Sequence, residues 1–582
     1  MVVALFFASS LLSADAMRPG SLGSPINASA IRFKDIRYLE RSLDDFGPRK
    51  ATVLVFVTND CPLVRRYYPV LRDLEKKYQG KGVVFAAINV SPGDSIREMA
   101  RQPLDFDLPI LFVKDVGAKV AMQLGVTRTP EVIVLDDKSI LRYRGRIDDQ
   151  HRLGGSLPRP TQNNLADALD SILNGSSVST PETPVDGCAI SFPSPRKTTP
   201  NAEVAAALVQ KHCVECHTAG GSAPFALDSP QSVQKHAAMI AEVVADGRMP
   251  PWYGSESQTF RNHRDLTRDE QESVVVWAFS GAPSPNCEIL KPVPPKLVDG
   301  WEIGKPDRII TMVGKHTIPA TGLVDYKYVV LPSVFFNDTW VSGIEIRASN
   351  PRVLHHCNLG FGELGGDARR PGFITGKVPG GQAMTLHDGT AFMIPKGAVL
   401  GLEVHYTTSG KPEECVMSVG LKYATNVSHR LRHLEISAHR FSISAGDPFY
   451  KLVAARTLPY NAAAVGMFCH MHVRGRDMTF TAHEPGKPAE ELLCIPNYNF
   501  DWQQAYEYDP KNPKRLAKGT RVECVAHYDN SRFNPYNPDP TRVVPEGPQT
   551  KDEMMYGFFF YVDADEKLDL AIDPKTGFAK KR

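Results

Sequence analysis

The stretch "ATVLVFVTNDCPLVRRYYPVLRDLEKKYQ", residues 51–79, joins two different periodicities. Its opening run, 51–59, is mostly apolar and rich in β-branched residues, which predicts a buried strand. From Cys61 onward, apolar and charged residues follow each other at helical spacing, which predicts an amphipathic helix over 61–79. A second apolar run, "GVVFAAINV" at 82–90, predicts another strand. A strand, a helix and a strand in this order predict an α/β domain.

The α/β segment extends beyond this stretch. "LPILFV", "LGVTRTPEVIVLD" and "SILRYRGRI" supply further strands, so we expect the domain to cover 30–175. The chain then becomes rich in Ser, Thr and Pro, in "NGSSVSTPETP" and "PSPRKTTP". This composition is typical of a linker, which we place at 176–201.

One cysteine of the α/β segment stands where a strand turns into a helix. The helix N-terminus lowers the pKa of a thiol at Cys61. Thr129-Pro130 resembles the cis-proline loop of thioredoxin folds, which lies beside the active cysteine. The second cysteine of a C-x-x-C motif is absent, because Val64 stands in its place. We predict a redox thiol at Cys61, with Cys188 as its distant resolving partner; the alternative is a thioredoxin-like fold in which Cys61 has only a residual role.

After the linker, the predicted secondary structure changes twice, first to helices and then to strands. "AEVAAALVQKH", "SPQSVQKHAAMIAEVVADG" and "TRDEQESVVVWAFSG" predict an all-α domain over 202–285. After a Pro-rich joint, strand follows strand with turn residues between them. We expect two jelly-roll-like β-sandwiches in series, 295–430 and 431–565.

Length and composition limit the number of domains and the class of protein that the sequence can specify. A chain of 582 residues is too long for one hydrophobic core. Its 67 Lys and Arg balance 65 Asp and Glu, which gives no sign of nucleic-acid binding. The first sixteen residues hold an apolar run ending in Ala14 and Ala16, typical of a signal peptide, although no basic residue precedes the run. We therefore expect a periplasmic or secreted protein, with a retained membrane anchor or a buried first strand as alternatives for 1–16.

"CVECH", Cys213 to His217, is the attachment pattern of c-type haem. In this pattern Cys213 and Cys216 bind the porphyrin covalently, and His217 becomes the proximal iron ligand. "GRMPPWY" supplies Met249 as the second axial ligand. The segment resembles cytochrome c domains, which acquire their haem outside the bacterial cytoplasm. A C-x-x-C zinc or redox site is the alternative.

The β region carries histidines in two sets. "VLHHCN" holds His355 and His356, and "LEVHY" holds His405; "CHMHVRGR" holds His470 and His472. A methionine follows in "KDEMM". Imidazole suits Cu, Zn, Fe and Ni, whereas a thioether selects soft Cu(I). The five histidines and this methionine together suggest two sets of metal ligands, one of three imidazoles and one of two imidazoles plus a thioether.

This order of motifs resembles the copper type II, ascorbate-dependent monooxygenases of the peptidylglycine and dopamine type, over 295–562. The resemblance implies an electron-storing copper on the first set and a catalytic copper, where O2 binds, on the second. Its ligands would be His470, His472 and Met554, with Met555 a less favoured candidate. Bacterial relatives of this family are commonly fused to cytochrome c and thioredoxin-like domains, the order of domains expected here. The substrate contacts of the animal enzymes have no match, so the resemblance names no substrate.

We expect structural roles for four cysteines of the β region. Cys357 and Cys469 adjoin histidines, and alternation along a strand directs them away from those histidines. We expect structural thiols or disulfides at these positions, with a modulating role near copper as the alternative. We expect Cys494 and Cys524 to form a disulfide in an oxidising compartment. A weaker expectation joins Cys287 to Cys415.

Taken together, the sequence predicts a multidomain oxidoreductase with two coppers and one haem c. It would hydroxylate a C–H bond of a small molecule or peptide with O2, using electrons that an ascorbate-like reductant or a redox protein supplies and that the haem delivers. The alternative is a copper- and haem-binding electron-transfer or copper-handling protein without hydroxylase turnover. A thiol peroxidase that depends on Cys61 is a third reading.

Overall fold

The computed structural model describes residues 20–580 except 153, 193–200, 219–222, 256–257, 284–288, 293–299, 364–371 and 379–380. The expected leader over 1–16 and the expected Cys287–Cys415 bridge involve residues outside that description. The chain divides into two compact units, Met1–Pro195 and Arg196–Arg582. None of the described helices is long and apolar enough to cross a membrane.

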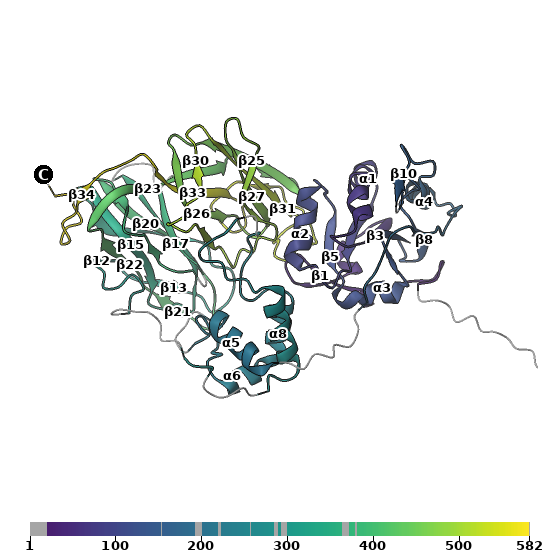
Figure 1. Ribbon diagram of the computed structural model, residues 1–582, viewed down its shortest axis with the longest axis horizontal. Helices are drawn as coiled ribbons and strands as arrows, with labels where there is room; N and C mark the ends of the chain where they lie inside the picture. The colour runs from purple at the N-terminus through teal and green to yellow at the C-terminus, as the bar shows by residue number, and fades with distance from the viewer. Residues whose placement is uncertain are drawn as a thin grey trace, which may run out of the picture. The chain divides into compact units, whose positions relative to one another are not determined.

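The first unit is built around the predicted strand, helix and strand. β3 (Ala51–Val57) is buried along its whole length, α1 (Pro62–Tyr78) follows it, and β4 (Val83–Asn89) pairs with β3 in parallel. The sheet runs in the order β2-β1-β5-β4-β3-β7-β8, with helices packed on it (Figure 1). The prediction of an α/β domain is confirmed.

The other elements of this unit are mostly short. Its further strands are β1 (Arg32–Asp35), β2 (Glu40–Ser42), β5 (Leu111–Lys114), β6 (Arg128–Thr129), β7 (Glu131–Asp136), β8 (Leu141–Gly145), β9 (His151–Arg152), β10 (Gly155–Ser156) and β11 (Cys188–Ala189). Its further helices are α2 (Ile96–Asp105), α3 (Lys119–Leu124) and α4 (Asn164–Leu173). The α1 helix begins with a proline, which suits the first helical position because that residue needs no backbone donor.

The second unit opens with a helical segment. It holds α5 (Ala202–His212), α6 (Pro230–Lys235), α7 (Ala237–Ala245) and α8 (Arg268–Phe279). Val209, Val214, Ile240 and Trp277 belong to one apolar cluster of this segment. Helices are few elsewhere in this unit, whose described remainder is dominated by β-sheet.

The first half of the β region is a sandwich of two sheets, in the orders β12-β22-β15-β19 and β14-β20-β16-β17. Side chains from both sheets share one core, which includes Val341, Leu359, Leu402 and Val419. The strands are β12 (Arg308–Thr311), β13 (His316–Ile318), β14 (Lys327–Val334), β15 (Thr339–Ala348), β16 (Leu354–Glu363), β17 (Gly372–Lys377), β18 (Met384–Thr385), β19 (Gly389–Ile394), β20 (Ala398–Tyr406), β21 (Glu413–Cys415) and β22 (Met417–Tyr423).

The second half repeats this arrangement with sheets in the orders β23-β33-β26-β29 and β25-β31-β27-β28. A Cβ added at Gly557 of one sheet would lie 3.0 Å from the Phe480 ring of the other, so the two sheets pack face to face. The strands are β23 (Asn426–Ala438), β24 (Ser442–Ile443), β25 (Tyr450–Thr457), β26 (Ala462–His470), β27 (Gly475–His483), β28 (Glu490–Ile495), β29 (Ala505–Glu507), β30 (Arg515–Leu516), β31 (Arg521–Tyr528), β32 (Val544–Pro545), β33 (Met555–Asp563) and β34 (Leu570–Ala571).

The two halves share a strand. The first part of β23 pairs in parallel with β19 of the first half, and its second part pairs with β33 of the second half. The boundary predicted between residues 430 and 431 therefore falls inside one continuous strand.

The expected disulfide between Cys494 and Cys524 is wrong. Cys494 lies opposite Thr479 of β27, whereas Cys524 lies opposite the next residue, Phe480. Consecutive residues of a strand face opposite sides of the sheet, and residues directly across from each other share a face. The two thiols are therefore separated by β27 and point to opposite faces, a geometry that a disulfide cannot span.

Candidate functional site

The first histidine set lies where β16 and β20 pair. Ligand atoms of His355, His356 and His405 all lie within 4.8 Å of one another. His356 and His405 are direct cross-strand partners. Neighbouring residues on a regular strand point in opposite directions, but the register shifts between Leu354 and His356. This irregularity gathers two consecutive histidines into one cluster.

Hydrogen bonds fix which nitrogen of each imidazole faces the cluster. The Nδ1 atoms of His355 and His356 lie 2.9 Å apart. Their Nε2 atoms are occupied elsewhere, by Asp501 Oδ1 at 2.8 Å and by the Tyr326 hydroxyl at 2.9 Å respectively. His405 Nδ1 is buried and has no hydrogen-bond partner in the described part of the chain. The Nδ1 atoms of His355 and His356 are thus bonded only to each other, and His405 Nδ1 has no partner, so a metal ion bound by all three would replace the bond between His355 and His356.

The second histidine set lies at the end of β26, with the His470 and His472 rings 5.2 Å apart. His470 Nδ1 is 2.6 Å from Gln503 Oε1, and His472 Nδ1 is 3.0 Å from the backbone oxygen of Asp552. Because both partners are oxygen acceptors, each Nδ1 carries the proton. Both Nε2 atoms are buried without a partner among the described residues. Two lone pairs in a buried site are thus left for an electrophile.

The two sets lie next to each other. The His356 and His470 rings are 6.0 Å apart between their centroids. Tyr326 links the sets, because its ring stacks on His405 at 4.8 Å and lies 6.0 Å from the ring of His472. Phe500 also contacts rings of both sets.

Strand alternation separates the two candidate methionines. His470 lies directly opposite Tyr556 in the pairing of β26 with β33. The pairing ends there, because β26 ends at His470 and β33 begins at Met555; strand alternation continued one residue further would place Met554 on the same face as Tyr556 and His470. Met555 faces the other side and is fully buried, at 0% exposure. The geometry favours Met554 as the thioether of the second set.

A buried carboxylate orders the loops that carry the second set. Glu553 accepts backbone N–H bonds from His472 at 2.9 Å, Arg474 at 2.8 Å and Met554 at 3.3 Å. Burial raises the pKa of Glu553 to about 8, although these bonds and the Arg474 charge favour its ionised form. Arg474, only 1% exposed, donates to Asn530 and to the Lys551 backbone oxygen. Through these hydrogen bonds, Arg474 of "HMHVRGR" and Glu553 of "KDEMM" hold in place the loops that carry the second histidine set.

Burial favours the neutral imidazole at His356, His405, His470 and His472. Burial, aided by the other histidines, lowers the pKa of His356 well below its usual range and that of His405 to about 4. The pKa of His472 falls to about 3 for the same reasons, and that of His470 is lowered by burial. Neutral imidazole is the form that binds metal ions.

No function is predicted from the sequence for the segment 500–504. Asp501 holds His355 and Gln503 holds His470, while Phe500 packs against the histidine rings. Gln504 donates a 2.7 Å bond to the Pro251 backbone oxygen in the helical segment. These contacts join residues far apart in the chain, so no local sequence pattern predicts them.

The C-x-x-C-H motif follows α5 directly. Backbone bonds from Cys216 and His217 to the Cys213 oxygen close its turn. His217 Nδ1 lies 3.0 Å from the Phe225 backbone oxygen, so this nitrogen carries the proton and Nε2 keeps its lone pair. Burial lowers the pKa of His217. Met249 is half-buried in the turn after α7.

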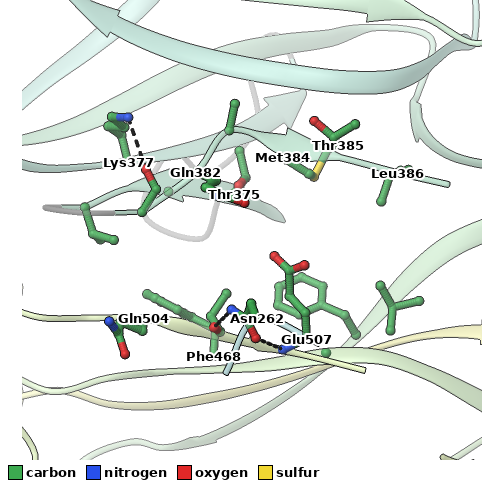
Figure 2. A pocket seen from close by; sticks show the side chains of 18 of the residues that line it. Asn262, Thr375, Lys377, Gln382, Met384, Thr385, Leu386, Phe468, Gln504 and Glu507 are labelled. Carbon is green, nitrogen blue, oxygen red and sulfur yellow. Dashed lines mark hydrogen bonds between the residues drawn. The ribbon is translucent and has the colours of Figure 1, made fainter. Parts of the chain in front are cut away.

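A cavity of about 1280 Å³ lies between the helical segment and the two β halves. Figure 2 shows its two walls, with Lys377 and Met384 on one and Phe468, Gln504 and Glu507 on the other. Further lining residues include Cys216 of the C-x-x-C-H motif and Gln503, the partner of His470. The cavity thus reaches from the predicted haem attachment site to the support of the second histidine set.

The thiol pair lies in the first unit, by itself. Cys61 Sγ is 2.9 Å from Cys188 Sγ and 3.3 Å from the backbone oxygen of Thr129. The Thr129–Pro130 peptide is cis, as the thioredoxin-like loop predicts. The two cysteines predicted as redox partners are therefore brought together from opposite ends of this unit.

Comparisons with known proteins bear on the first unit. A hypothetical protein from Sinorhizobium meliloti 1021 is 26% identical over 30% of this chain and 96% of its own, with a TM-score of 0.28. An uncharacterised conserved protein from Geobacillus kaustophilus is 27% identical over 31% and 96%, with a TM-score of 0.28. A putative thioredoxin from Neisseria meningitidis is 17% identical over 26% and 91%, with a TM-score of 0.21. No curated protein matches the chain. The model of the Redoxin family matches residues 40–159, so the first unit contains a redoxin domain.

Proposed function

We propose that the β region is a copper-dependent monooxygenase that hydroxylates a C–H bond with O2. One observation carries the proposal: the buried Nδ1 of His405 and the buried Nε2 atoms of His470 and His472 have no hydrogen-bond partner in the described part of the chain. The first of these nitrogens lies in a cluster with His355 and His356, and the other two lie in the adjoining set, which gives two distinct donor sets. A purely structural histidine would use both nitrogens for hydrogen bonds, because a buried polar atom without a partner destabilises the fold.

The donor sets fit copper. His355, His356 and His405 would hold the first ion, and His470, His472 and Met554 the second. Imidazole alone does not distinguish copper from zinc, but a thioether favours Cu(I). Copper bound in these sets supplies one-electron chemistry with O2, which permits insertion of an oxygen atom into a C–H bond.

The protein's own groups prepare this chemistry. Asp501 and Gln503 orient one imidazole in each set, as partners behind metal ligands generally do. Tyr326 and Phe500 cover the rings and keep water from them. The adjoining cavity, far larger than a single water site, gives room for an organic substrate or for the porphyrin.

The helical segment would hold a c-type haem on Cys213 and Cys216, with His217 and Met249 as axial ligands. The free Nε2 of His217 supports this. A continuous path of bonds joins this segment to the second histidine set. It runs from Met249 through Pro251 to Gln504, then through Gln503 to His470. Such a path would suit electron delivery to the second set, and covalent haem attachment supports a location outside the cytoplasm.

Incubation of the copper-loaded protein with ¹⁸O₂, a reductant and a library of C–H substrates tests the monooxygenase. We expect ¹⁸O in a product of the native protein and none with His472→Ala, whose second donor set has lost a nitrogen. His483→Ala is the control, because this histidine lies at the far end of β27 beside Glu523. Reductant-driven cycling of the metals without labelled product would support an electron carrier in place of the monooxygenase.

A second prediction concerns the haem. Protein made in a host that matures c-type cytochromes should carry one covalent haem, and Cys213→Ala with Cys216→Ala should abolish it. Haem that survives acid-acetone extraction of the double variant would contradict the assignment. Met249→Ala should keep the covalent haem and lower its reduction potential, because thioether ligation raises that potential.

A further inference from the structure

The redoxin domain carries a thiol site that none of the metal chemistry uses. Cys61 occupies the N-cap position of α1, and Cys188 is the first residue of β11. β11 pairs with β6, so that Cys188 lies directly across from Thr129. Because the Cys61 sulfur also contacts the Thr129 oxygen, the same residue positions both thiols. Their sulfurs are 2.9 Å apart although 127 residues separate them in the chain.

The chain is built for this close approach. Gly187 precedes Cys188, and a Cβ at this position would lie 2.3 Å from the backbone oxygen of Thr129. Only glycine lets β11 come this near. Arg128 fastens the same turn by donating a 2.7 Å bond to the Gly187 oxygen.

The two thiols differ in access and in acidity. Cys61 is only 2% exposed, whereas Cys188 is partly exposed. Burial alone would raise the pKa of Cys61, but bonds from the Cys188 thiol and from the backbone of the α1 N-terminus bring it below its ordinary value. Burial and the adjacent Cys61 raise the pKa of Cys188 to about 11. The covered sulfur is the better leaving group, and the reachable sulfur belongs to Cys188.

We propose that Cys61 and Cys188 form a reversible dithiol–disulfide couple in which external thiols attack Cys188 and Cys61 leaves. A thiolate of an external dithiol bonds to Cys188 Sγ, the bond between the two cysteines breaks, and Cys61 departs with the electron pair. The second thiolate of the reductant then attacks its own bound sulfur, and Cys188 is released and takes up a proton. The external dithiol loses two electrons and becomes a disulfide, while the protein disulfide is reduced to two thiols.

Glutathione tests the proposal on the full-length protein. Equilibration with oxidised glutathione, followed by acid quenching and peptide mapping, should show a bridge between Cys61 and Cys188. In Cys61→Ser, oxidised glutathione should leave a mixed disulfide on Cys188. In Cys188→Ser, whose hydroxyl still covers Cys61, labelling at Cys61 should be slower by on the order of tenfold. Free thiols at both positions in the oxidised native protein, or faster labelling of Cys61 than of Cys188, would overturn the proposal.

A glycine pair supplies a control that spares both cysteines. Gly187→Ala should yield less of the bridge at the same glutathione ratio, because β11 can no longer sit against Thr129. Gly155→Ala, where an added Cβ meets nothing within 4 Å, should bridge like the native protein. Circular dichroism confirms that each variant is folded. Equal formation of the Cys61–Cys188 disulfide in both variants would show that the close approach of β11 to Thr129 does not depend on Gly187, and it would contradict the proposal.

Discussion

In the Met554→Ala protein loaded with Cu(I), X-ray absorption is expected to show no sulfur neighbour of copper, whereas Met555→Ala should retain it. The reason is strand alternation: continued beyond the pair of His470 with Tyr556, it would place Met554 on the face of His470 and Met555 on the opposite face. A thioether binds Cu(I) far better than Cu(II), so the difference should be largest in the reduced protein. Hydroxylation should be lost in Met554→Ala and kept in Met555→Ala.

The two methionine variants also differ in stability. Met555 is fully buried at the start of β33, and its truncation should cost about 2–5 kcal/mol of unfolding free energy. Sulfur that persists in Met554→Ala and disappears in Met555→Ala would transfer the ligand role to Met555. Sulfur that persists in both would point to a cysteine, with Cys469 beside His470 as the first candidate.

Glu553→Ala is expected to lower the free energy of unfolding by about 2–6 kcal/mol, at about 1–3 kcal/mol for each of two buried backbone donors left without an acceptor. These donors are the backbone N–H groups of His472 and Arg474. Glu553→Gln should be nearly as harmful, since one of its two polar atoms becomes a donor facing a backbone N–H. Urea unfolding measures both effects.

An exposed glutamate provides the comparison for Glu553. Glu414 pairs with Lys315 at 2.6 Å, and the Glu414 side chain is 56% exposed. Its replacement by alanine should change the free energy of unfolding by less than about 1 kcal/mol. A similar small change in Glu553→Ala would show that the carboxylate does not organise the loops of the second set.

Local pattern was sufficient for the first unit and for the histidine motifs. The apolar run of β3 and the helical spacing of α1 are properties of consecutive residues, so the α/β domain could be predicted from them. The first histidine set illustrates the limit. Strict alternation would send His355 and His356 to opposite faces, and the register shift that gathers them depends on how β16 pairs with β20.

The faces of the cysteines and the contacts of the histidines depend on pairing between distant parts of the chain, which local sequence patterns do not reveal. The sequence predicts a disulfide between Cys494 and Cys524, but β27 lies between their strands and its register turns the two thiols to opposite faces. Tyr326 and Asp501 reach the histidines from distant parts of the chain. Neither belongs to a periodic or metal-binding pattern, so only the fold brings them to the site.

The metal content of protein purified without added metal tests the central claim most directly. Inductively coupled plasma mass spectrometry of the native protein, beside a His405→Ala, His472→Ala double variant, reports both the identity and the number of bound ions. The account predicts two copper ions per chain beyond the haem iron in the native protein and loss of both in the double variant. One copper ion per chain, or zinc in place of copper, would contradict it.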